Sequence, residues 1–136
     1  MANQIQIAIR QTAASTSEAA IRQHKLLVDR PEAKGGEDRG PMGGELFLAA
    51  IGGCFMSNLL AAIKGRQADV SDAQLEVIGI LAESPSRFTA VELNVTAKYA
   101  DRELFEKLVE IADRGCIMMN TLRGKLDIKV HIAALV

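Results

Sequence analysis

The chain has 136 residues, of which 49% are hydrophobic and 24% are charged. This length predicts a single domain over residues 1–136, large enough to bury a core without disulfide stapling. The 16 basic and 17 acidic side chains give a formal net charge of −1. The sequence therefore lacks the basic surface that binds nucleic acid or an anionic membrane, and we expect neither partner.

The N-terminal sequence Met-Ala-Asn-Gln-Ile-Gln has neither the basic start nor the apolar stretch of a secretory signal. We therefore expect a cytoplasmic protein with reduced thiols. The uncharged run Leu46–Ile63 is long enough to be tested as a membrane span, but it contains Gly52, Gly53, Ser57 and Asn58. We interpret it as a buried core helix.

The first third of the chain reads as strands followed by a loop. Ile5, Ile7 and Ile9 alternate with polar residues, the pattern of a half-buried strand. The segment Ala19–Val28 predicts two strands joined by a tight turn. Gly, Pro and charged residues dominate Asp29–Gly44, which predicts a loop.

The first predicted helix, Glu45–Lys64, is apolar almost all round. A helix without a polar face must be covered on every side, either by its own sheet or by a second subunit. This helix therefore indicates a dimer.

The remaining elements follow in a clear order. They are a hairpin of Gln74–Leu81 and Thr89–Tyr99, an amphipathic helix capped by Asp101 and ended by Gly115, a short helix from Cys116 or Ile117 to Leu122, and a strand over Leu126–Ile132. The order of strands, buried helix, hairpin, helix and strand predicts an α+β fold rather than a wound parallel sheet.

Cys54 and Cys116 are the only cysteines, and each lies in a context that suits reactivity. Cys54 lies within Gly-Gly-Cys-Phe, and Cys116 follows a helix-ending glycine. Two thiols so placed suggest a redox pair. The alternative, that each is a small buried hydrophobe, stays open at this point.

Metal and cofactor motifs have little support in this sequence. His24 and His131 form no ligand cluster with either cysteine, and Cys-x-x-Cys and His-Glu-x-x-His spacings do not occur. The glycines at 35–44 do not follow the dinucleotide-binding pattern. We expect no metal and no cofactor.

Two segments resemble a known family. Residues 40–54, Gly-Pro-Met-Gly-Gly-Glu-Leu-Phe-Leu-Ala-Ala-Ile-Gly-Gly-Cys, are similar to the Gly-Pro-x-Pro-x-Glu-Leu-Leu-x-Ala-x-x-Gly-x-Cys segment of the OsmC/Ohr family, the osmotically inducible and organic-hydroperoxide-resistance proteins. Cys116 with Asn120-Thr121-Leu122 resembles the second motif of that family, Cys-Pro-x-Ser-Asn-Thr-Leu. The resemblance favours the short OsmC-like branch.

The resemblance implies an intertwined homodimer, with central cysteine helices covered by curved sheets. It also implies a peroxidase of the oxidative and osmotic stress response that acts on organic hydroperoxides and is re-reduced by a dithiol.

In such a site, Cys54 would attack the peroxide as a thiolate, which requires a nearby cation or a helix N-terminus to lower its pKa. Cys116 would resolve the resulting sulfenic acid into a disulfide, and its position near the start of a short helix suits a thiolate. A disulfide needs the two Cα atoms within about 7 Å.

Glu45 matches the glutamate of the family motif, which is implied to hold an arginine against the thiol. In one straight helix Glu45 and Cys54 would be separated by about 13.5 Å and project from opposite faces. Glu45 must then serve the partner subunit or lie outside a straight helix. A simpler role is favourable interaction with the helix dipole. Arg22 is the preferred arginine, and Arg30 and Arg39 are alternatives.

Phe47, Ala50, Ile51 and Cys54 share one helix face. This face predicts an apolar substrate wall that favours an alkyl or aryl hydroperoxide, although it also fits a plain core face.

The chain departs from the family motifs at three positions. Ile117 and Met119 replace Pro and Ser, and Gly43 replaces a proline. The change at Met119 removes a hydroxyl donor. Two other functions therefore stay open: a non-catalytic dimeric module that binds a ligand or a protein, and a cysteine redox sensor.

Overall fold

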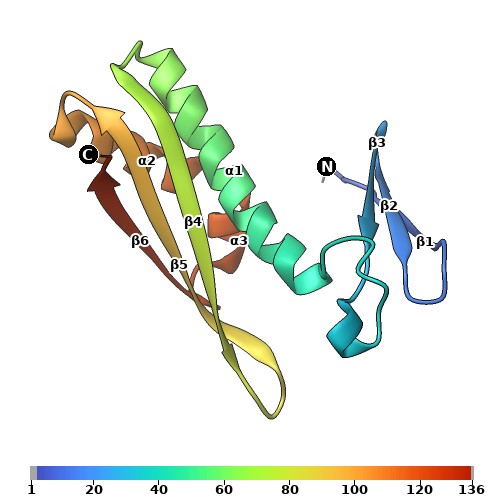
Figure 1. Ribbon diagram of the computed structural model, residues 1–136. Helices are drawn as coiled ribbons and strands as arrows, with labels where there is room; N and C mark the ends of the chain where they lie inside the picture. Colours follow the sequence, from blue (N-terminus) through green and yellow to red (C-terminus); the bar gives the residue numbers. More distant parts are fainter. Residues whose placement is uncertain (1–2, 136) are drawn as a thin grey trace. The chain divides into compact units, whose positions relative to one another are not determined.

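The computed structural model describes residues 3–135. The chain forms two compact units, one up to Phe47 and the other from Leu48 onward. Helix α1 (Gly43–Gly65) begins in the first unit and continues through the second (Figure 1). The α+β class is confirmed, and the assignment of residues 1–136 to one domain stays a prediction.

The N-terminal unit contains an antiparallel sheet in the order β1-β2-β3. Its strands are β1 (Ala8–Gln11), β2 (Ser17–Ile21) and β3 (His24–Val28). Ile21 pairs with His24, which leaves a two-residue turn, and Arg22 in this turn adopts a left-handed φ of 55°. The predicted strand, turn and strand over Ala19–Val28 are confirmed, but the turn is Arg22-Gln23 rather than the expected Gln23-His24, so Arg22 lies in the turn and not at the end of the first strand.

The first strand differs from its prediction. It begins only at Ala8, and Ile5, Ile7 and Ile9 are 87%, 50% and 66% exposed rather than half-buried. The physical reason is that the alternation specifies a face to be covered, whereas residues 3–47 supply no second layer over it.

The loop after β3 is fixed by one buried carboxylate. Asp29 accepts hydrogen bonds from the Thr16 hydroxyl (2.8 Å) and from the amides of Arg30 (2.7 Å) and Arg39 (3.2 Å). Burial acts to raise the pKa of Asp29, but these hydrogen bonds outweigh it and lower the pKa well below its usual range. Inside the predicted loop, a single 3₁₀ turn (η1) spans Glu32–Lys34.

Helix α1 is long and apolar enough to cross a membrane by length and composition, with a mean hydropathy of 2.0 in its most apolar window. Only 22% of that window is buried in the single chain. The buried residues are Ile51, Gly52, Phe55 and Leu59. The prediction of a buried core helix therefore holds for one side of α1, and the rest of the helix is uncovered in one chain.

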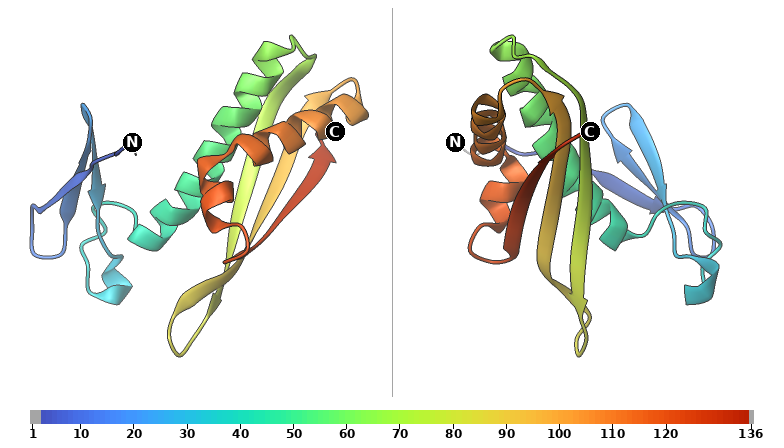
Figure 2. Two further views of the ribbon diagram at one scale, coloured as in Figure 1. Left: turned by 180° about the vertical axis from the view of Figure 1, so that it is seen from behind. Right: turned by 60° about the vertical axis from the view of Figure 1, so that its left-hand side comes forward.

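The C-terminal unit contains a second sheet in the order β4-β5-β6. Its strands are β4 (Val70–Ala82), β5 (Arg87–Tyr99) and β6 (Asp127–Ala134). The predicted hairpin of β4 and β5 is confirmed, and β6 pairs parallel to β5. The central strand β5 buries alternate residues completely: Val91, Leu93, Val95 and Ala97. The helices of this unit cover that face of the sheet (Figure 2).

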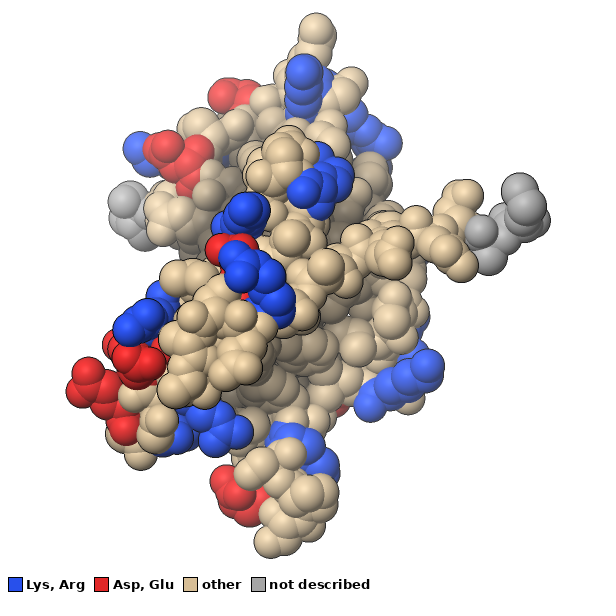
Figure 3. Space-filling view, turned by 90° about the vertical axis from the view of Figure 1, so that its right-hand side faces the viewer, with Lys and Arg blue, Asp and Glu red and all other residues tan. Residues whose placement is uncertain are grey.

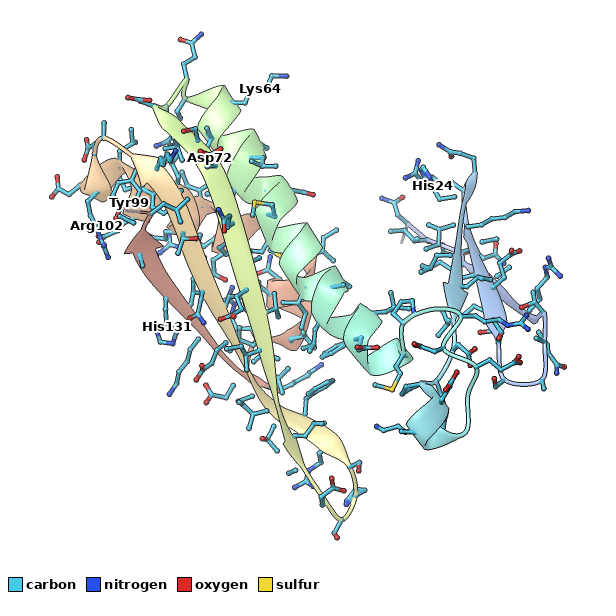
Figure 4. The ribbon with its side chains drawn as sticks, in the orientation of Figure 1. His24, Lys64, Asp72, Tyr99, Arg102 and His131 are labelled. Atoms are coloured by element: carbon cyan, nitrogen blue, oxygen red, sulfur yellow. The ribbon has the colours of Figure 1, made fainter. Side chains whose placement is uncertain are left out.

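Helices α2 (Arg102–Gly115) and α3 (Ile117–Leu122) connect β5 to β6. The predicted cap is confirmed, because Asp101 Oδ1 accepts the Leu104 amide at 3.2 Å. Arg102 donates to the Tyr99 hydroxyl at 3.1 Å and to the Ile132 carbonyl at 3.5 Å. Figure 4 shows Arg102 beside Tyr99, where it ties the start of α2 to two strands.

Candidate active site

The structure brings the two cysteines together in the C-terminal unit. Cys54 lies on α1, and Cys116 lies at the junction of α2 and α3. The Cys116 thiol donates to the Cys54 sulfur, with the two Sγ atoms 3.1 Å apart, and both cysteines are free. A disulfide bond measures about 2.05 Å, so a small local movement would suffice to form one.

The backbone between the two helices places the second thiol. Helix α2 ends at Gly115, and Cys116 has an extended backbone (φ −81°, ψ 120°) before α3 begins. Cys116 is fully buried, whereas Cys54 is half-buried. Cys54 is therefore the cysteine that solvent can reach.

The surroundings favour a thiolate at Cys54. Burial acts to raise the pKa of the Cys54 thiol, but hydrogen bonds from the Met118 amide, the Cys116 thiol and the Ile117 amide outweigh it, so the pKa is lowered. The donating amides belong to the first turn of α3, where backbone N–H groups have no partner within the helix.

The same turn does not favour a thiolate at Cys116, contrary to the sequence-based expectation. Burial raises the pKa of Cys116, the Met119 and Met118 amides act to lower it, and the hydrogen bond and negative charge of Cys54 raise it further. Cys116 is consequently the thiol that keeps its proton. The helix start acts mainly on the neighbouring sulfur.

Asn58 is a polar neighbour of the thiol that the sequence analysis did not select. Its Nδ2 donates to the Cys54 carbonyl at 3.0 Å and lies 3.9 Å from Cys54 Sγ. One signal could have identified it. Asn58 follows Cys54 by four residues, about one helical turn, inside a run that is otherwise almost entirely apolar.

Glu45 lies in the first turn of α1 and in the N-terminal unit. Its Oε1 accepts the Met42 amide at 2.8 Å, so the carboxylate satisfies a backbone donor at the helix start. Helix α1 runs without interruption from Gly43 to Gly65, so Glu45 lies within the helix. Its service to the Cys54 of a partner subunit stays a prediction.

The three candidate arginines all belong to the N-terminal unit. Arg22 is exposed in the β2–β3 turn, Arg30 is exposed after β3, and Arg39 pairs with Glu37 at 2.9 Å. The assignment of any of them to the thiol stays a prediction.

The predicted substrate wall divides into residues of different accessibility. Ala50, one turn before Cys54, is exposed, and Phe47 is half-buried. Ile51 is fully buried and packs in the core, so in this conformation it cannot contact a substrate. Ile117, whose amide faces Cys54, instead presents a side chain that is 68% exposed.

Metal ligands are not gathered in the described part of the chain. Among residues 3–135, no group of three or more His, Cys, Asp and Glu side chains could hold a metal ion. On the face drawn in Figure 3, basic side chains lie among acidic ones at several points.

Comparison with known proteins connects this geometry to a family. The family model described as OsmC-like protein matches residues 35–131. Curated proteins gave no match.

Solved structures with the same fold cover nearly the whole chain. The OsmC-like protein from Mycoplasma pneumoniae has a TM-score of 0.87 at 16% identity, over 100% of both chains. A hypothetical protein from Aquifex aeolicus has a TM-score of 0.84 at 14% identity, over 98% of both chains. The organic hydroperoxide resistance protein OhrB of Bacillus subtilis has a TM-score of 0.70 at 22% identity, over 96% of this chain and 98% of its own. At these identities the likeness establishes the fold.

Proposed function

This chain belongs to the OsmC-like protein family, and on that premise we propose that it reduces organic hydroperoxides with Cys54 as the attacking thiol and Cys116 as the resolving thiol. The observation that carries the proposal is the 3.1 Å separation of the two sulfurs. The similarity to a protein named for organic hydroperoxide resistance supports the choice of substrate.

The two thiols differ in the way that such a reaction requires. Cys54 is accessible and has a lowered pKa, whereas Cys116 is buried and has a raised pKa. An attacking thiol must be a thiolate that the oxidant can reach, and a resolving thiol must lie beside the product of that attack. The proposal therefore gives each cysteine the step that its surroundings favour.

In the first step the Cys54 thiolate attacks the distal oxygen of the hydroperoxide and the O–O bond breaks. Cys54 becomes a sulfenic acid, and the alkoxide leaves and takes a proton to become an alcohol. The Cys116 sulfur then attacks the Cys54 sulfur, which forms the disulfide and releases water. An external dithiol reduces the disulfide by exchange and is itself oxidised, which restores both thiols.

We also propose that the working form is a homodimer in the cytoplasm. The uncovered side of α1 and the exposed isoleucines of the N-terminal segment support a second copy as their cover, because large apolar surfaces are rarely left to solvent. In this form Glu45 and Arg22 would serve the thiol of the other subunit. A reducing compartment supplies the dithiol that the cycle consumes.

A groove beside α1 favours a second candidate function, a non-catalytic binding module. The groove has a volume of about 550 Å³ and lies between α1 and β4. Its lining residues are mostly small or apolar: Ala49, Gly52, Gly53, Met56, Ala73, Gln74, Leu75 and Val77. In that case the cysteines would never pair during function.

Consumption of tert-butyl hydroperoxide in the presence of a dithiol distinguishes the two candidates. The unmodified chain should turn over, Cys54→Ser should lose turnover, and Cys116→Ser should stop with Cys54 oxidised to a sulfenic acid, which a dimedone adduct would reveal by mass spectrometry. Ser86→Ala, in the exposed turn between β4 and β5, is the control. Equal peroxide consumption in all four proteins would eliminate the peroxidase.

A further inference from the structure

Asn58 is chemically out of place in α1. The run Leu46–Ile63 carries no charge, and its polar side chains other than cysteine are Ser57 and Asn58. Asparagine is a weaker helix former than the alanines and leucines around it. Ser57 is exposed to solvent, whereas Asn58 is half-buried and directed back toward the preceding turn. A half-buried amide among apolar side chains needs a hydrogen-bond partner.

That partner is Cys54. Asn58 Nδ2 donates one hydrogen to the Cys54 carbonyl at 3.0 Å. Nδ2 also lies 3.9 Å from Cys54 Sγ, within the range of a weak hydrogen bond to sulfur. An amide nitrogen carries two hydrogens, so both contacts can be made together. The carbonyl contact holds the amide in place, and the second hydrogen is left for the sulfur.

The other end of the amide faces the residue that precedes the second thiol. A Cβ built on Gly115 would stand 3.6 Å from Asn58 Oδ1, an ordinary van der Waals distance. Asn58 thus lies between the turn that carries Cys54 and the residue that precedes Cys116. A side chain in this position can influence the charge on Cys54 without contacting the peroxide.

We propose that Asn58 is a positioning residue that stabilises the Cys54 thiolate through Nδ2 and orients its sulfur toward Cys116. The inference rests on the proposed function in that it assigns Asn58 to the nucleophile of that reaction. It adds a side-chain donor to the Ile117 and Met118 amides, and this donor comes from the same helix as the thiolate.

The test uses the full chain with Cys116→Ser, which leaves Cys54 as the one thiol, and follows thiolate absorbance near 240 nm against pH. Adding Asn58→Leu should raise the pKa of Cys54 by about half a unit, which lowers the thiolate fraction about threefold at acidic pH. Asn58→Asp should raise it further, because it replaces a donor by a negative charge. Asn94→Leu makes the same substitution on β5, where the Asn94 amide donates to Glu76, and as the control it should leave the titration unchanged.

Two other results separate the possible outcomes. The inference is overturned if Cys54 has the same pKa in the Asn58→Leu and Asn58→Asp variants as in the protein with Cys116→Ser alone. This holds whatever the stability of the variants to urea. If the Asn58 substitutions shift the titration but the protein with both cysteines consumes no hydroperoxide, the proposed function fails while the role of Asn58 stands.

Discussion

Gly52 of α1 lies so close to Val77 of β4 that a Cβ on Gly52 would stand 2.7 Å from the Val77 Cγ2 atom. The side chain of valine is branched at Cβ and has little freedom to rotate away. Gly52→Ala should therefore push the helix from the sheet and lower the free energy of unfolding by about 1–3 kcal/mol, measured by urea denaturation.

Gly65→Ala is the matched control for this substitution. Gly65 ends the same helix, and a Cβ there would meet nothing within 4 Å. Replacing a helical glycine by alanine without a clash should raise the stability by up to about 1 kcal/mol. Equal losses in both variants would mean that close packing at Gly52 is not the cause.

The lowered pKa of Cys54 predicts an unusual pH dependence of alkylation. Only the thiolate reacts, so the rate of Cys54 with iodoacetamide should stay high as the pH falls below the ordinary thiol pKa of about 8.5. The rate should then decline as the pH falls through the lowered pKa. Cys116 should react more slowly, because it is buried and its pKa is raised. Peptide mapping of partly alkylated protein measures both rates, and a faster reaction at Cys116 at neutral pH would contradict this assignment.

Much of this fold could be predicted because its elements carry strong local patterns. The alternation along β5, the Asp101 cap and the apolar run of α1 each specify an element without reference to distant residues. The pairing of β6 parallel to β5 could not be read in this way. It depends on how α2 and α3 return the chain, which is a property of packing rather than of periodicity.

The candidate site shows the same division. Both cysteines could be predicted as site residues from the sequence. The 3.1 Å separation of their sulfurs depends on how α1 packs against the α2–α3 junction, which the sequence pattern does not show. Asn58 and the first-turn amides of α3 could not be predicted as neighbours of the thiol. Their contact with the Cys54 sulfur depends on where each N–H group points, which a sequence pattern does not determine. Glu45 and Arg22 stay predictions, since a motif match does not place one side chain against another.

Asp29 should make the stability of the protein depend on pH in a defined range. Its pKa is lowered in the folded chain, so the unfolded chain binds a proton first when the pH falls below about 4. The contribution of Asp29 is thus fully present above that pH and is lost on further acidification. Asp29→Asn should flatten the acidic fall in the free energy of unfolding, measured by urea denaturation between about pH 2 and 6. Asp38→Asn makes the same charge change at an exposed position of that loop, and an identical flattening there would contradict the role of Asp29.

The uncovered side of α1 predicts self-association. Its exposed residues recur at helical spacing and are small or apolar until the last: Ala50, Gly53, Ser57, Leu60 and Lys64. Leu60 alone keeps 51% of its surface exposed, and a stripe of this kind is the usual contact between packed helices. Sedimentation velocity should therefore show a dimer that persists on dilution. Leu60→Glu should shift it toward monomer because it would bury a charge without a partner. Lys107→Glu changes charge at an exposed position of α2 and should leave the dimer intact. A monomer at every concentration would show that a second copy does not cover α1.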